Sequence, residues 1–161
     1  MECFNILVWN CRGAGNDNFK RNFRDITNQH KPEVVALLKT KVELKSMGMF
    51  FKHLGFTAAT HVDPNGRAGG LWILWDPLKV SLNTTHKTSQ VIHTTVCKDN
   101  FDEWIFSAVY ASPNPRVREI LWEELGHQAA NTQIPWLLAG DFNDTTSFEE
   151  SKSSAPDTSS S

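Results

Sequence analysis

The chain opens with two apolar runs separated by an amphipathic segment. Residues 4–9 are β-rich and end abruptly at the polar, glycine-containing stretch 10–15, which predicts a strand followed by a loop. The next apolar residues recur at helical spacing with basic residues between them, which predicts a helix capped by Asp17; they are Phe19, Phe23 and Ile26. Residues 33–38 are again apolar. The order strand, helix, strand predicts a β-α-β unit on a sheet covered on both faces.

From residue 56 onward, short β-rich runs alternate with turn clusters such as 63–66 and 98–100. The predicted strands are 56–61, 69–75, 80–85, 91–97 and 104–110. This spacing predicts an antiparallel meander. A last apolar strand is expected at 135–139.

Two further helices complete the predicted elements. Residues 43–54 favour a weak helix, and Pro115 begins a stronger one. Its apolar face is predicted to consist of Val117, Ile120, Leu121 and Leu125. Mixed strands with flanking helices indicate an α/β fold.

Composition narrows the class of protein. The 161 residues are 40% hydrophobic and 21% charged, which is typical of a globular domain and not of a disordered or coiled-coil chain. No apolar run is long enough to cross a membrane and none resembles a secretory signal, so no membrane partner is expected. The three cysteines lack CxxC spacing, which favours a reducing compartment, nuclear or cytoplasmic. We predict one domain over residues 1–150 and a serine-rich disordered tail over 151–161.

The charges are distributed unevenly along the chain. Residues 1–60 carry a net charge of +4, and residues 61–161 a net charge of −6. A surface that binds a polyanion is therefore expected in the first third, unless these cations belong to an ordinary solvated surface. The candidate nucleic-acid contacts are Arg12, Lys20, Arg21 and Arg24.

Polar residues follow directly after three of the predicted strands. Asn10 ends the first strand, and Asp141 and Asn143 follow the last. Amide and carboxylate oxygens at strand ends suit a hard cation and a phosphate group, although Asp and Asn also terminate strands for turn chemistry alone. Tyr110, the only tyrosine, ends the strand 104–110. Its phenol could donate to a phosphate or simply belong to the core.

The order of these pieces resembles the endonuclease/exonuclease/phosphatase superfamily, and more narrowly the endonuclease domain of plant LINE-type non-LTR retrotransposons. The matching segments are Trp9-Asn10-Cys11-Arg12-Gly13, Pro32 to Val42, Gly69-Gly70-Leu71, Tyr110-Ala111-Ser112-Pro113-Asn114 and Gly140-Asp141-Phe142-Asn143. The resemblance covers roughly residues 4 to 150. It implies a four-layer α/β sandwich of two mixed sheets flanked by helices, with the second sheet incomplete. It also implies Mg²⁺-dependent hydrolysis of a phosphodiester, with DNA as the partner.

The resemblance assigns a role to each candidate residue. Asn10 would position a catalytic group or a metal-bound water, and Asn10 and Asp141 would be metal ligands. Tyr110 and Asn143 would hold the phosphate, and Asp141 would orient or deprotonate the water. These roles meet the needs of a dianionic transition state, which requires donors, a cation and a base.

Two departures from the family pattern predict an inactive enzyme. Lys39 stands where the family has a metal-binding Glu. At about 4 Å and an effective dielectric constant of about 20, each pair of unit charges is worth roughly 4 kcal/mol, so exchange of the carboxylate for an ammonium opposes a cation unless Lys39 turns to solvent. The family's terminal Ser-Asp-His is also missing from this chain. The loss of a positioned acid or base alone costs about 10²–10⁴ in rate.

If the second sheet is incomplete, as the resemblance implies, an apolar sheet face is expected to be left uncovered. By pattern this face includes Leu74, Val109 and Leu137, and such a patch favours self-association. The functions that remain open are a degenerate endonuclease, an active nuclease that tolerates Lys39, a non-catalytic module that binds nucleic acid or a partner, and a pseudogene-derived product without a selected role.

Overall fold

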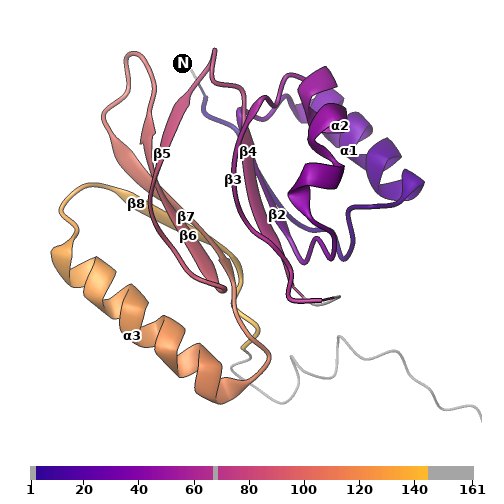
Figure 1. Cartoon of the computed structure of the whole chain (residues 1–161). Helices are drawn as coiled ribbons and strands as arrows, with labels where there is room; N and C mark the ends of the chain where they lie inside the picture. The colour runs from indigo at the N-terminus through magenta and orange to yellow at the C-terminus, as the bar shows by residue number, and fades with distance from the viewer. Residues whose placement is uncertain (1–2, 67–68, 145–161) are drawn as a thin grey trace, which may run out of the picture.

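Two sheets lie face to face in the computed structural model, which describes residues 3–66 and 69–144. Helices α1 (Asp17–His30) and α2 (Gly48–His53) cover the outer face of one sheet, and α3 (Pro115–Asn131) covers the outer face of the other (Figure 1). The fold is therefore a four-layer α/β sandwich of mixed sheets flanked by helices, which confirms the expected class. The predicted tail, 151–161, lies outside the described residues.

The first sheet confirms the predicted β-α-β unit. Its strands are β1 (Ile6–Asn10), β2 (Val34–Leu38), β4 (Leu71–Trp75) and β3 (Ala58–Val62), in the order β1-β2-β4-β3. β1 and β2 are parallel and connected through α1, and the other pairs are antiparallel. β2 and β4 are buried along their whole length, which explains why both are continuous apolar runs.

The second sheet has the simple order β5-β6-β7-β8. Its strands are β5 (Ser81–Lys87), β6 (Val91–Cys97), β7 (Trp104–Tyr110) and β8 (Trp136–Asp141). β7 and β8 are parallel and are connected through α3. A single meander was therefore the wrong prediction, because the chain leaves the first sheet after β4 and only β5, β6 and β7 form a meander.

The helices differ from the sequence prediction in three details. Asn16, not Asp17, caps α1, and its side chain accepts a hydrogen bond from the backbone of Phe19 at 2.7 Å. The helix predicted over 43–54 is broken into a short 3₁₀ turn, Leu44–Ser46, and α2. Ile120 does not belong to the buried face of α3, since its side chain is 63% exposed.

The core has three parts, one between the sheets and one under the helices on each side. Leu74 and Val109 were predicted to face the interior of the sandwich, but they pack beneath the helices instead. Leu137 alternates with neighbours that pack toward α3, so it lies on the inner face, and it is 45% exposed. Of the three residues predicted to form an uncovered inner face, only Leu137 lies on that face and is exposed. No helix in the described ranges is long and apolar enough to span a membrane.

Candidate functional site

Asn10 and Asp141 meet where β1 and β8 end. The side-chain amide of Asn10 donates a hydrogen bond to Asp141 Oδ2 at 3.1 Å, and this bond connects one sheet to the other. The oxygen of the same side-chain amide, Asn10 Oδ1, is buried and has no hydrogen-bond partner among the described residues. The structure thus places two of the predicted site residues in direct contact, 131 positions apart in the chain.

Asn143 and Tyr110 join the same cluster. The backbone N–H of Asn143 donates to Asp141 Oδ1 at 2.8 Å, and its side-chain amide donates to Ala111 O at 3.4 Å. Tyr110 is paired with Asp141 in the register of β7 and β8. Burial raises the pKa of the Tyr110 phenol, the charge of Asp141 raises it further, and the charge of Arg12 lowers it. The phenol is therefore protonated at neutral pH and available as a donor.

A lysine-bearing turn follows β2 at this end of the sandwich. The backbone N–H of Lys39 donates to Gly70 O at 2.9 Å, and its carbonyl accepts from Gly13 N at 2.9 Å. Lys41 N donates in turn to Gly69 O at 3.0 Å. A side chain at Gly70 would collide with the hydroxyl of Thr40, so only glycine allows this close approach.

The backbone is unusual around this end of the molecule. Among the described residues other than glycine, six have a positive φ, and four of these lie here. They are Arg12, Lys39, Lys41 and Asn143, with φ between 50° and 62°. Left-handed conformations of this kind cost free energy and persist where the surroundings fix them, often at functional sites.

A cleft of about 530 Å³ opens beside Tyr110, between the two sheets. Lys39 and Lys41 lie on the side of the first sheet, and Gln90 and Ser112 on the side of the second. Lys39 and Tyr110 were predicted from the sequence, whereas Lys41 and Gln90 were not. A second lysine two positions after Lys39 was a visible signal, whereas nothing in the sequence distinguishes Gln90, which is brought to the cleft only by the pairing of β6 with β7.

The basic residues predicted to bind nucleic acid belong to two places. Arg12 lies in the loop after β1, and its charge lowers the pKa of the Tyr110 phenol. Lys20, Arg21 and Arg24 lie on α1, where the charged groups of Lys20 and Arg24 stand 5.8 and 5.0 Å from the centre of the Phe50 ring. Arg12 is therefore part of the strand-end cluster, and the other three belong to the outer helical layer.

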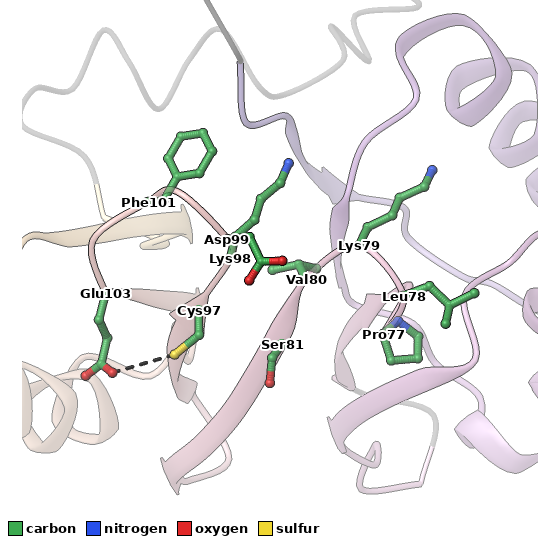
Figure 2. Close-up of a pocket in the computed structure, with 10 residues that line it drawn as sticks. All are labelled: Pro77, Leu78, Lys79, Val80, Ser81, Cys97, Lys98, Asp99, Phe101 and Glu103. Carbon is green, nitrogen blue, oxygen red and sulfur yellow. Dashed lines mark hydrogen bonds between the residues drawn. The ribbon is translucent and has the colours of Figure 1, made fainter.

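A second hollow, of about 350 Å³, lies at the opposite end of the sheets, where β6 ends and β7 begins (Figure 2). None of the predicted site residues lines it. Its Lys98 forms an ion pair with Glu33, and its Cys97 thiol donates to Glu103 Oε2 at 3.6 Å. The strand-end cluster is the stronger candidate site, because it brings the predicted site residues together and the second hollow does not.

The sequence profile described as the Endonuclease/Exonuclease/phosphatase family matches residues 7–161. The chain belongs to the endonuclease/exonuclease/phosphatase family. None of the curated proteins matches its sequence. The family assignment agrees with the observed sandwich.

Solved structures share the fold of this family member at low sequence identity. The endonuclease domain of TRAS1, a telomere-specific non-LTR retrotransposon, has a TM-score of 0.68 at 11% identity, over 89% of this chain and 62% of its own. Zebrafish (D. rerio) TDP2 complexed with a single-strand DNA product has a TM-score of 0.67 at 13% identity, over 88% of this chain and 61% of its own. An AP endonuclease from Archaeoglobus fulgidus has a TM-score of 0.65 at 14% identity, over 88% of this chain and 58% of its own. The chain thus spans about three-fifths of the length of these structures.

Members of this family generally depend on a divalent metal, but the described residues do not supply a set of ligands that fits one. Within residues 3–66 and 69–144, no group of three or more His, Cys, Asp or Glu side chains could hold a metal ion. Asp141 already accepts a hydrogen bond at each carboxylate oxygen, and the turn after β2 supplies lysines. A divalent cation needs several oxygen ligands with compensating negative charge, so one aspartate and one free amide oxygen are too few.

Proposed function

We propose that this chain is a catalytically inactive member of the family, derived from a retroelement-type DNA endonuclease. One observation carries the proposal. Asp141 is held between Asn10 and Asn143, and the turn after β2 carries Lys39, which lines the cleft beside Tyr110 and stands where the family resemblance implies a carboxylate. The groups that would orient a phosphate are retained, whereas the groups that would hold a cation are not.

The chemistry of phosphodiester hydrolysis explains why this combination is inactive. The transition state carries extra negative charge and needs a cation, hydrogen-bond donors and a base. In this proposal Asn10, Asn143 and Tyr110 supply the donors, and Asp141 is a carboxylate that could accept a proton from water. No residue of the cluster provides a place for a divalent cation. Without a cation to compensate the negative charge of the transition state, the cluster can bind a phosphate but supports little turnover.

Nicking of supercoiled plasmid in the presence of Mg²⁺ tests this proposal. We expect the unmodified chain, Asp141→Ala and the exposed control Asp102→Ala to leave the plasmid equally intact. Nicking that persists in Asp102→Ala and disappears in Asp141→Ala would overturn the proposal and identify an active nuclease that tolerates Lys39.

Binding of nucleic acid without cleavage is the second candidate function. It is favoured by Lys20 and Arg24, which lie together over the Phe50 ring at the surface of α1, and by Arg12 and Arg21 in the same third of the chain. Phosphate contacts release counterions, so DNA affinity should fall linearly with the logarithm of salt concentration. Removal of Lys20 and Arg24 should reduce that slope. A lack of DNA binding at low salt would exclude this function.

Self-association is part of the same proposal. Leu137 exposes an inner-face side chain on β8, and the inner-face residues Ile6 and Val8 of β1 are only half-buried. Two copies that met through this end would remove apolar surface from water. Sedimentation velocity should show a dimer that weakens in Leu137→Lys, and a monomer at all concentrations would exclude it.

We further propose an intracellular location, nuclear or cytoplasmic, because Cys3, Cys11 and Cys97 are all unpaired.

A further inference from the structure

The cleft beside Tyr110 has the size of a site for one nucleotide. Its volume of about 530 Å³ lies within the range of small-ligand pockets, roughly 300–1,000 Å³. A double helix is far too wide to enter such a space, whereas a single sugar-phosphate unit fits. Tyr110 connects this cleft to the strand-end cluster, because it lines the cleft and is also paired with Asp141.

The charge of the cleft is positive on the side of the first sheet. Lys39 and Lys41 line this side, and Asp63 is the only carboxylate among the described lining residues. Asp63 is already engaged, since Oδ2 lies 3.6 Å from His61 Nε2 and Oδ1 accepts from the backbone of Leu44 at 3.4 Å. Two ammonium groups thus stand against one carboxylate among the described lining residues, so this wall carries net positive charge, which suits an anion.

The backbone that carries the two lysines is fixed in an uncommon conformation. Lys39 has φ of 57° and Lys41 has φ of 62°, so both lie in the left-handed region that lysine rarely adopts. Their N–H groups donate to Gly70 and Gly69, respectively. A left-handed residue costs about 1–3 kcal/mol, and the chain bears this cost twice within three residues. Such a segment is preorganised, because its shape is set before any ligand arrives.

The opposite wall is held in place by Gln90. This side chain is buried, its amide donates to Val117 O at 3.0 Å, and its carbonyl oxygen accepts from Ser112 N at 2.7 Å. Gln90 thereby fixes the loop after β7 to the first turns of α3. Pro113 and Val117 give this wall an apolar surface, against which a sugar or a base can pack.

We infer that this cleft binds the phosphate of one nucleotide of a nucleic-acid strand through the ammonium groups of Lys39 and Lys41, without a divalent cation. The inference rests on the proposed function, because it assigns a ligand to the same inactive site. The lysines then take over the charge compensation that the metal provides elsewhere in the family, and they do so for binding only.

Fluorescence anisotropy in EDTA tests this inference. The probes are a labelled 5′-phosphorylated single-stranded oligonucleotide and its unphosphorylated twin, with inorganic phosphate as competitor. We expect binding that Mg²⁺ does not strengthen. Lys39→Gln and Lys41→Gln should each weaken it about tenfold, as expected for the loss of one charged hydrogen bond. Lys39→Arg and Lys41→Arg should retain it, and so should Lys52→Gln, an exposed lysine on α2. Tighter binding of the phosphorylated probe would identify a strand end, and equal binding would identify an internal phosphate.

Two outcomes would overturn the inference: binding that requires Mg²⁺, or binding that Lys39→Gln and Lys41→Gln leave as strong as Lys52→Gln does. Circular dichroism of each variant establishes that the fold is retained. The result is separable from the proposed function. Asp141-dependent nicking with lysine-dependent binding in EDTA would reject inactivity alone. An intact plasmid with lysine-independent binding would reject the inference alone.

Discussion

Gly140 determines, at the scale of a single residue, how Asp141 reaches the site. Its φ is +147°, and a Cβ at this position would collide with the backbone of Val109 on the neighbouring strand. β8 can approach β7 so closely only because this position lacks a side chain. The next residue, Asp141, is thereby brought within reach of Asn10.

Substitution of Gly140 by alanine should therefore destabilise the protein. We expect a loss of about 3 kcal/mol in the free energy of unfolding, because both the strained φ and the backbone contact oppose a Cβ. Gly126→Ala is the matched control, since nothing lies within 4 Å of the added atom on the exposed face of α3. That control should gain about 0.5–1 kcal/mol from helix propensity. Urea unfolding measures both, and equal stability of the two variants would contradict this account of Gly140.

The residues of the site were predictable to different degrees. Asn10, Tyr110 and Asp141 each end an apolar strand, and a polar residue in that position is visible in the sequence because the strand itself is. Gln90 and Val117 come from the start of β6 and the start of α3. Their meeting at one cleft depends on the packing of α3 against the sheet, and no local pattern carries that information.

At the scale of elements, a buried polar chain connects α3 to the second sheet. His93 of β6 is fully buried, its Nδ1 forms a hydrogen bond with Ser107 Oγ, and Ser107 Oγ accepts from the indole of Trp136 at 2.8 Å. On its other side, His93 Nε2 lies 3.6 Å from Glu124 Oε1 of α3, which His86 Nε2 approaches to 3.2 Å. Leu121 and Leu125 pack the helix against the sheet, whereas His93 Nε2 and Glu124 Oε1 are buried without a hydrogen-bond partner among the described residues.

The burial of His93 should make stability depend on pH. Burial lowers the pKa of His93 below its ordinary value near 6.5, with Glu124 opposing and His86 reinforcing the shift. Because the unfolded chain then binds the proton more readily, the stability from neutral His93 is complete above pH 6.5 and is lost as the pH falls below that value. Urea unfolding on either side of this pH should show the loss in the unmodified chain and in the exposed control His53→Gln. His93→Gln should show a smaller dependence, and an unchanged dependence would contradict the assignment.

Element prediction succeeded where a strand is bounded by turns and failed where local signals compete. β6 and β7 were predicted to the residue, because each alternates or runs apolar between polar clusters. The segment 43–54 contains apolar residues at helical spacing, but Gly48 begins a new helix after the 3₁₀ turn instead of continuing one. Asn16 and Asp17 are both good caps, and only the backbone conformation decides between them.

At the scale of the whole molecule, β1 and β8 are edge strands of the two sheets among the described residues. β4 is buried on both faces, so its apolar run carries no information about which face meets the other sheet. The interior of β7 is likewise buried on both faces. For these reasons the sequence predicted one meander and placed Leu74 of β4 and Val109 of β7 on the wrong faces. Leu137 was placed correctly because it lies on an edge strand that has no further strand beside it among the described residues.

The central claim, that a family fold persists here around a site without the ligands for a divalent cation, is tested most directly by a titration with Mn²⁺ followed by electron paramagnetic resonance. We predict no saturable binding of Mn²⁺ to the unmodified chain and the appearance of one site in Lys39→Glu, which restores the carboxylate beside Asp141. One ion bound tightly per unmodified chain, and released in Asp141→Ala, would contradict the claim.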